Sequence, residues 1–93
     1  MREREIESAL VTSVQKKHGL ALKLTSPGLD GVPDRLVLFA DGRIGFVELK
    51  APGQKMRPLQ EKRKRQLEAL GFLVFCVDGT DKIEEVLHAI QST

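Results

Sequence analysis

Hydrophobic positions along this 93-residue chain follow two periods, one typical of helices and one typical of strands. Within residues 2–18, Ile6, Leu10 and Val14 recur at helical spacing, and Gly19 follows as a residue that ends helices. Residues 20–25 alternate as a strand does, and the turn-forming residues of 26–33 indicate a loop. The chain is therefore expected to begin with a helix, a strand and a long loop.

The middle of the chain predicts a hairpin and a second helix. Residues 34–39 and 43–50 are apolar enough for two strands, and Ala40-Asp41-Gly42 between them is typical of a hairpin loop. Residues 51–57 break the pattern, and Pro58 suits the first position of a helix that runs to Leu70. The apolar stripe of this helix is expected to consist of Leu59, Leu67 and Leu70.

The last third predicts one more strand and one more helix. Residues 72–77 form a nearly continuous apolar run, as in a strand buried on both faces, and residues 81–91 have a helical apolar pattern. The order α-β-β-β-α-β-α allows an antiparallel meander followed by a parallel strand joined through a helical crossover. We predict an α/β (α+β) fold, with one domain over residues 1–93 and a mixed four-stranded sheet flanked by helices.

Composition narrows the functional classes. Hydrophobic residues make up 41% and charged residues 30%, which suits a folded globular domain. The single cysteine excludes an intrachain disulfide and a cysteine-based zinc site. No apolar run approaches the ~20 residues of a membrane span, and the N-terminus lacks the apolar segment of a signal peptide. We therefore expect a cytoplasmic protein with no membrane partner.

The small net charge of +2 hides an uneven distribution. Residues 50–65 contain seven basic residues and one acid, whereas residues 78–93 contain four acids and one lysine. A basic block of this kind indicates a surface that faces a polyanion, although a solvated helix surface explains it equally well. Tryptophan and tyrosine are absent, which argues against stacking of nucleic-acid bases on aromatic side chains.

Three polar residues occupy unusual positions in the predicted hairpin. Asp34 opens an apolar strand, and Glu48 and Lys50 share one face at the end of the next strand. A three-residue loop at 40–42 would pair Asp34 with Glu48 on one face, whereas a two-residue turn would separate them. Two carboxylates suit Mg²⁺ or Mn²⁺, and a lysine beside them can orient a water or stabilise charge on a phosphate.

The same residues carry a family resemblance. Pro33-Asp34 followed by Glu48-Leu49-Lys50 resembles the PD-(D/E)XK nuclease signature, and the segments SPGLDGVPDRLVLF and GFVELKAPGQKMRPLQ resemble the virus-type replication-repair nuclease (VRR-NUC) domain. The resemblance extends from about Glu7 to Val77. It implies a restriction-endonuclease-like core and a divalent-metal-dependent DNA endonuclease, related in fold to Holliday-junction resolvases, in a bacterial or phage-infected cell.

The resemblance also implies roles for individual residues. Asp34, Glu48 and the backbone carbonyl of Leu49 would bind Mg²⁺ or Mn²⁺, with Lys50 as the catalytic lysine. Glu7 matches a helix glutamate that reaches the site and is a candidate further metal ligand, and Gln60 matches a glutamine beside the site. We also predict DNA contacts from basic residues, namely Lys23, Arg35, Lys55, Arg57, Lys62 and Lys64.

Simpler interpretations exist for each of these residues. Asp34 alone suits a strand-start cap, Glu48 with Lys50 suits a surface ion pair, and Gln60 suits a helix cap. The rival function is a non-catalytic nucleic-acid-binding module that uses the basic helix of residues 57–70. Because a duplex presents two strands of opposite polarity, we also expect a homodimer, with the first helix and the last strand–helix unit as candidate interfaces.

Overall fold

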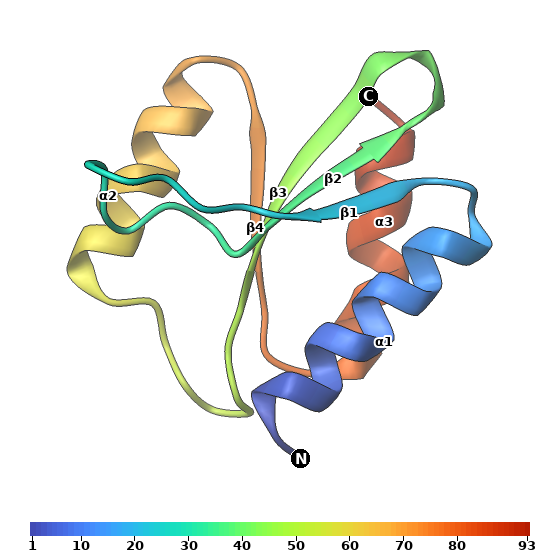
Figure 1. Cartoon of the computed structure of the whole chain (residues 1–93), viewed down its shortest axis with the longest axis horizontal. Coiled ribbons are helices and arrows are strands. Elements are labelled where there is room, and N and C mark those ends of the chain that lie inside the picture. The colour runs from blue at the N-terminus through green and yellow to red at the C-terminus, as the bar shows by residue number, and fades with distance from the viewer.

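The computed structural model describes residues 1–93 and has the predicted order of elements (Figure 1). Each helix and strand begins and ends within a few residues of the expected position. The helices are α1 (Glu3–Lys16), α2 (Pro58–Ala69) and α3 (Ile83–Gln91), and the strands are β1 (Leu20–Lys23), β2 (Arg35–Phe39), β3 (Arg43–Leu49) and β4 (Leu73–Val77).

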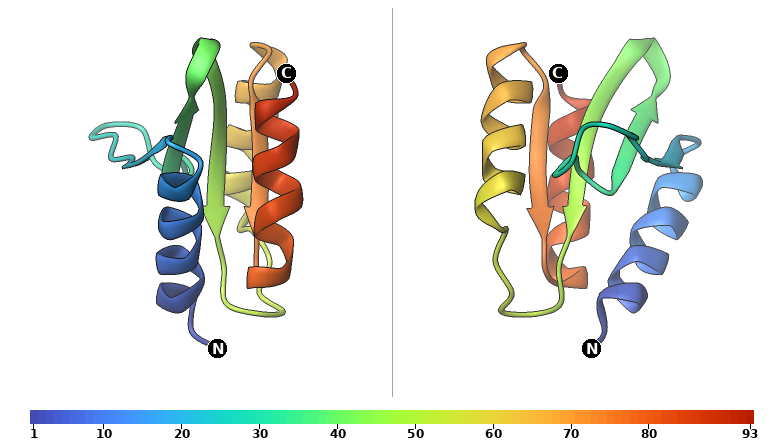
Figure 2. Two further views of the ribbon diagram at one scale, coloured as in Figure 1. Left: turned by 90° about the vertical axis from the view of Figure 1, so that its right-hand side faces the viewer. Right: turned by 60° about the vertical axis from the view of Figure 1, so that its left-hand side comes forward.

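The four strands form one mixed sheet in the order β1-β2-β3-β4. Strands β1, β2 and β3 are antiparallel neighbours, and β4 runs parallel to β3, as the chain order predicted. Helices α1 and α3 lie on one side of the sheet and α2 lies on the other (Figures 1 and 2). No helix is long and apolar enough to span a membrane.

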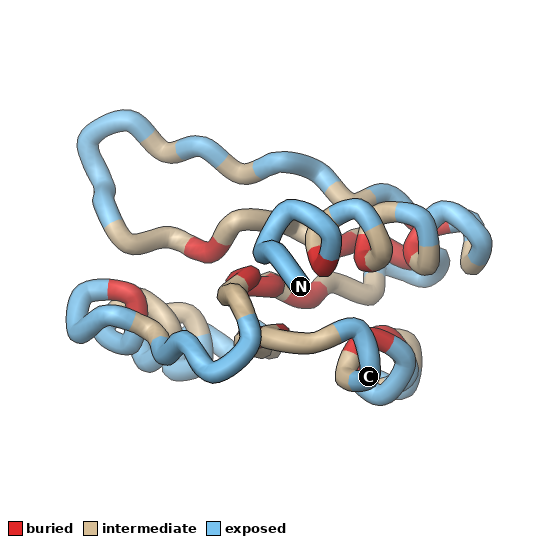
Figure 3. Tube along the Cα trace, turned by 90° about the horizontal axis from the view of Figure 1, so that it is seen from below, coloured by how far each residue is buried: buried red, intermediate tan, exposed pale blue.

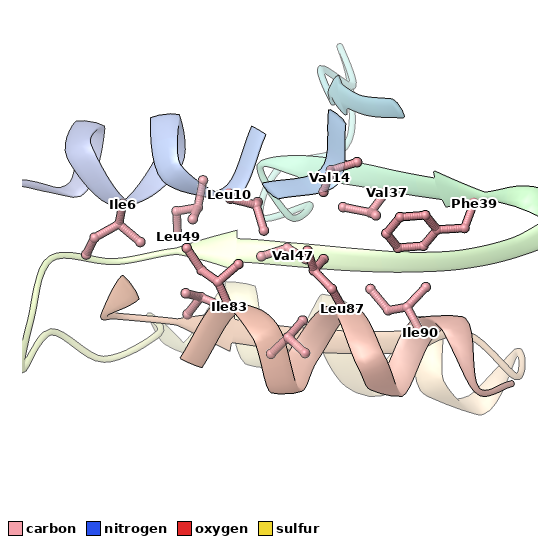
Figure 4. Packing of buried hydrophobic residues seen from close by; sticks show 12 residues of the cluster. Ile6, Leu10, Val14, Val37, Phe39, Val47, Leu49, Ile83, Leu87 and Ile90 are labelled. Carbon is pink, nitrogen blue, oxygen red and sulfur yellow. The ribbon is translucent and has the colours of Figure 1, made fainter. Parts of the chain in front are cut away.

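The hydrophobic core lies between the sheet and the pair α1 and α3. Val37 of β2 and Val47 of β3 are fully buried there against side chains of both helices (Figure 4). The tube in Figure 3 shows that the buried residues of the chain lie on the inner sides of the helices and along the sheet. One face of the sheet therefore packs against the core. Because side chains alternate along a strand, the residues between these core residues point to the second face of the sheet.

The hairpin register answers the question left open by the sequence. Phe39 pairs with Arg43, so the connection is the three-residue loop 40–42. Asp41 and Gly42 both have left-handed backbone angles, with φ of 65° and 71°. A three-residue hairpin loop needs such conformations, and glycine adopts them without strain. The odd loop length brings Asp34 and Glu48 to the same face.

The second face of the sheet carries three rows of side chains, which follow from the pairing of the strands, extended by one residue at each end. The row nearest the hairpin loop consists of Leu20, Leu38, Ile44 and Phe72. The next row consists of Leu22, Leu36, Phe46 and Val74. The third row consists of Leu24, Asp34, Glu48 and Cys76. We call the first two rows the open face, because two helices cover the opposite face of the sheet and only α2 lies on this side.

Two expectations about burial are wrong. Strand β4 is an edge strand, with only Val74 and Val77 buried, because no neighbouring strand covers its outer side. The stripe expected on α2 is also wrong, since Leu59 and Leu70 are exposed and the buried residue of that helix is Gln60. Helix α2 thus contributes little to the core and holds a polar side chain near the third row.

Candidate active site

Asp34 and Glu48 lie opposite each other in the third row. The last pair of β2 and β3 is Arg35 with Val47, and the next positions in the same register are Asp34 and Glu48. The backbone N–H of Leu24 donates to the carbonyl of Asp34 at 2.9 Å, which continues the β1–β2 ladder past its end. The two acids therefore follow the register of the hairpin one residue past its last pair, as expected for a three-residue loop.

Glu48 is a carboxylate inside the protein. It is 1% exposed, and its Oε1 is buried without a hydrogen-bond partner. The pKa of Glu48 is raised to about 7, chiefly by burial and next by the nearby carboxyl of Asp34, while Lys50 opposes both effects. An unpartnered buried carboxylate oxygen is costly, so a site of this kind suits a bound cation.

Lys50 follows β3 directly and lies beside Glu48. Its Nζ is 3.4 Å from Oε2 of Glu48, and its side chain is 15% exposed. The backbone N–H of Lys50 donates to the carbonyl of Val77, which extends the parallel pairing and fixes the direction of the side chain. The ion pair is therefore largely buried, unlike the surface pair that was the simpler interpretation.

The donor set suits a hard divalent cation. No three histidine, cysteine, aspartate or glutamate side chains gather closely enough to form a protein-only metal cage. Mg²⁺ commonly binds through one or two carboxylates and keeps several of its waters. The pair Asp34 and Glu48, with one buried oxygen of Glu48 unpartnered, fits that mode of binding.

Glu7 reaches a different partner from the one expected. Its Oε2 accepts a hydrogen bond at 3.0 Å from Nε of Arg35, and the same guanidinium donates to the carbonyl of Ala21 at 3.0 Å. The neighbouring Ile6 packs close to Leu49 (Figure 4), so this part of α1 lies at the same end of the sheet as Glu48. The structure places Glu7 near the site but engages it in an ion pair.

Gln60 caps the start of α2. Its Oε1 accepts a hydrogen bond at 2.9 Å from the backbone N–H of Arg57, and the side chain is 7% exposed. The cap proposed as the simpler interpretation is therefore present. Because the cap uses Oε1, the Nε2 amide is the end of the side chain that remains available to a ligand.

The basic residues predicted to contact DNA divide into two groups. Lys23 and Arg35 pair across β1 and β2 on the core-side face, so their side chains extend from the face opposite to Asp34 and Glu48. Arg35 is also occupied by Glu7 and Ala21, which leaves its guanidinium no free role beside the acids. The exposed residues on the α2 side of the sheet are Lys55, Arg57 and Lys62. Lys64 forms an ion pair with Glu68 at 2.9 Å.

Two features of the site could not be read from the sequence. Cys76 aligns with Glu48 in the third row and is half-buried, and burial raises the pKa of its thiol. The loop 24–34 is docked on α2, because Nε of Arg63 donates to the carbonyl of Asp30 at 2.7 Å. A clue to the docking is Gly31, whose φ is +84° and where an added Cβ would lie 2.8 Å from Cγ of Leu59.

Comparison with known proteins agrees with this geometry. A curated relative named "Putative nuclease p44", from Acyrthosiphon pisum secondary endosymbiont phage 1, is 47% identical over 90 residues, which cover 97% of this chain and 96% of the relative. A solved structure described as a VRR-NUC domain matches with a TM-score of 0.86 and 28% identity, over 92% of this chain and 94% of that one. No protein-family model matches the chain.

Both matches extend over almost the full length of this chain. The mixed sheet flanked by helices is the fold of the matched domain, and Asp34, Glu48 and Lys50 occupy the motif positions from which the resemblance was drawn. The chain therefore belongs to the VRR-NUC family of the PD-(D/E)XK nucleases.

Proposed function

We propose that this protein is a divalent-metal-dependent DNA endonuclease that hydrolyses phosphodiester bonds at branched or duplex DNA. The observation that carries the proposal is the meeting of Asp34, Glu48 and Lys50 at one end of the sheet, where Glu48 is buried and one of its oxygens lacks a partner. The relative named as a nuclease and the matched VRR-NUC domain support this reading.

Asp34 and Glu48 would hold Mg²⁺ or Mn²⁺, and the resemblance adds the carbonyl of Leu49 and, less directly, Glu7. When bound, the cation would supply Lewis-acid polarisation of a phosphate oxygen and favour ionisation of a water. Oε2 of Glu7 accepts from the guanidinium of Arg35, so its other oxygen, Oε1, would be the one that joins. Asp34 and Glu48 are thus the minimal metal-binding pair.

Lys50 would act on the reacting groups. Its ammonium lies 3.4 Å from Oε2 of Glu48, so it balances part of the negative charge of the two acids and lies beside the proposed cation site. From there it can orient an attacking water and stabilise negative charge that develops on the phosphate. Gln60, through its free Nε2 amide, would hold a neighbouring phosphate oxygen in place.

Exposed basic residues beside the site would bind the DNA backbone. Lys55 and Arg57 lie in the segment between β3 and α2, and Lys62 lies on α2, on the same side of the sheet as the acids. Contacts with DNA phosphates fix the position of the protein on the DNA and make binding depend on salt, but they do not select a DNA sequence. Selectivity for DNA structure would then come from the shape of the surface around the site.

The rival function is a non-catalytic binding module that uses the basic helix. Such a module gains nothing from two acids placed where a phosphate must approach, because carboxylates repel a polyanion. The buried ion pair of Glu48 and Lys50 therefore favours catalysis. We further propose that the protein works as a homodimer, in the cytoplasm of a bacterial or phage-infected cell, and the phage origin of the relative supports that setting.

One substrate panel tests the proposal. Supercoiled plasmid, flap, splayed-arm and four-way-junction DNA would be incubated with the protein and Mg²⁺ or Mn²⁺, with EDTA as the control. We expect cation-dependent incision of at least one branched substrate. DNA binding without incision of any substrate under either cation would instead support the binding module.

A further inference from the structure

A hollow opens between loop 24–34 and α2, outside the site described above. Its volume is about 520 Å³, which lies within the range of about 300–1,000 Å³ that is usual for pockets of small organic groups. Leu29 and Val32 line it from the loop, and Leu67 and Leu70 line it from the helix. Leu29 and Leu70 are 45% and 73% exposed, so the apolar wall of the hollow is open to a ligand.

Contacts between the loop and α2 hold the hollow open. Nε of Arg63 donates to the carbonyl of Asp30 at 2.7 Å. At Gly31 the backbone lies so close to the helix that an added Cβ would be 2.8 Å from Cγ of Leu59. The loop runs beside α2 in Figure 1, and these two contacts fix it there. A preformed pocket of this kind binds a ligand without first having to order the chain.

Two polar side chains, Arg63 and Gln66, also line the hollow. Nη1 of Arg63 donates to Oε1 of Gln66 at 2.9 Å, which orients the amide. Because this bond uses Oε1, the Nε2 end of Gln66 is left as a hydrogen-bond donor. Apolar walls with a donor at the edge suit a flat heterocycle, which has apolar faces and acceptor atoms around its rim.

The charge beside the hollow is positive. Lys62 and Arg65 are exposed and form no ion pair, and each precedes a lining residue of the hollow by one helical turn. Helical spacing places the acids Glu61 and Glu68 on the opposite side of α2. An uncharged pocket with cations beside it suits a nucleobase whose sugar–phosphate chain runs past the cations.

We infer that this hollow binds an unpaired nucleotide of the DNA substrate and so selects flaps or splayed arms over fully paired duplex. A base can enter the hollow only if it has left the stack, which costs least where the base is already unpaired. Because every base has acceptor atoms, the donor on Gln66 would hold a base without selecting a sequence. A second copy of the chain is a poor occupant, since a two-fold contact here would bring Lys62 and Arg65 of both copies near one another.

The inference deepens the proposed function, on which it rests, because the hollow lies on the two segments that flank the candidate active site. The loop that lines it leads directly into Asp34, two residues after Val32. On the helix side, Leu67 follows Gln60 by seven residues, about 10 Å along α2. That distance equals about three nucleotides at the 3.4 Å rise of a DNA strand. The unpaired nucleotide would therefore lie about three nucleotides from the phosphate that is cut.

The test compares the wild-type chain with the double variant Leu29→Ala and Leu70→Ala, in Ca²⁺ so that no DNA is cut. The two probes are a fully paired duplex and a splayed-arm DNA of the same length, with the fluorescent base 2-aminopurine at each unpaired position in turn. We expect the wild type to bind the splayed-arm DNA more tightly and to change its fluorescence. The double variant should bind that DNA about fivefold to tenfold more weakly, as for the loss of one base contact, and should bind the duplex unchanged.

Leu22→Ala is the matched control, because Leu22 is 44% exposed, close to the 45% of Leu29, but does not line the hollow. It should bind both DNAs as the wild type does. Gln66→Glu is a second probe at an exposed position, since its carboxylate can still accept from Arg63 but the donor is lost. It should weaken binding of the splayed-arm DNA more than binding of the duplex, and it replaces the double variant if a thermal melt shows that variant to be unfolded.

Equal affinity of the wild type for the two DNAs, or equal weakening of both by the double variant, would overturn the inference. A wild-type oligomer that the double variant dissociates in the absence of DNA would also overturn it, because a second copy would then fill the hollow. Incision in Mg²⁺ separates this inference from the proposed function. Cutting without preference for unpaired DNA would retain the nuclease and refute the hollow as a binding site, whereas selective binding without cutting would do the reverse.

Discussion

The carboxylate of Asp34 accepts a hydrogen bond at 2.9 Å from the backbone N–H of Leu49. This bond joins the residue before β2 to the last residue of β3, where regular pairing of the two strands has ended. It uses Oδ2 and directs the carboxylate toward Glu48, whose pKa it raises. The positions of the two acids are thus set by local hairpin geometry.

The first prediction concerns the metal-binding pair. Asp34→Asn and Glu48→Gln should each abolish Mg²⁺-dependent incision, because each replaces a charged ligand with a neutral amide. Asparagine at position 34 can still accept the hydrogen bond from Leu49, so the fold should be retained. Gel-based incision assays and circular dichroism measure the two effects.

Asp41→Asn provides the matched control, since Asp41 is exposed at the hairpin tip, far along the strands from the third row. It should cut DNA as the wild type does. Incision at the wild-type rate by both site variants would contradict the assignment of the site.

The second prediction separates chemistry from binding at Lys50. Lys50→Ala should lower the single-turnover rate by about two orders of magnitude or more, the range usual for acid–base groups. Affinity for DNA, measured in Ca²⁺ to prevent cleavage, should change little, because the lysine is largely buried beside Glu48. A large loss of affinity with an unchanged single-turnover rate would instead make Lys50 a DNA-binding residue.

The third prediction follows from the raised pKa of Glu48, which is about 7 in the folded protein against 4.5 for an ordinary glutamate. Between these two values the folded state binds more protons than the unfolded state, so stability of the metal-free protein should fall as pH rises. The loss should be on the order of a few kcal/mol between pH 5 and pH 8. Urea unfolding at both pH values measures it.

Glu48→Gln should flatten this pH dependence, since glutamine does not ionise, and it should be more stable than the wild type at pH 8 without metal. Mg²⁺ should restore stability to the wild type and leave the variant unchanged. Parallel pH profiles for the two proteins would show that Glu48 is not the group responsible.

The fourth prediction tests the docking of loop 24–34 with a matched pair of glycines. Gly28 and Gly31 both have positive φ, at +86° and +84°, but an added Cβ at Gly31 would lie 2.8 Å from Cγ of Leu59, whereas at Gly28 it meets nothing within 4 Å. Gly28→Ala should cost about 1 kcal/mol for the left-handed backbone alone. Gly31→Ala should cost about 1–3 kcal/mol more, because the loop must move from α2.

Urea unfolding and DNA binding would be measured for both glycine variants. Weaker DNA binding confined to Gly31→Ala would show that the docked loop shapes the DNA surface. Equal stability of the two variants would mean that the contact with Leu59 does not hold the loop.

Much of the fold and of the site follows from local chemistry that a sequence displays. Helical and alternating apolar patterns placed all seven elements, because burial of one face is what selects each period. The odd-length hairpin loop at Ala40-Asp41-Gly42 determined that Asp34 and Glu48 share a face, since side chains alternate along each strand. The acids and Lys50 could be identified before any coordinates were known because their order and spacing resemble the PD-(D/E)XK signature. The register then showed which of the two possible loop lengths is present.

Tertiary structure decided the features that depend on which elements lie next to each other. Burial of Glu48, the ion pair of Glu7 with Arg35 and the alignment of Cys76 with Glu48 all join residues far apart in sequence. The missing helical cover of the open face was also decided by tertiary structure. The sequence pattern of a strand is the same whether or not a helix packs on its apolar residues. Periodicity states which residues share a face, and only the packing of the helices determines which face is left without a cover.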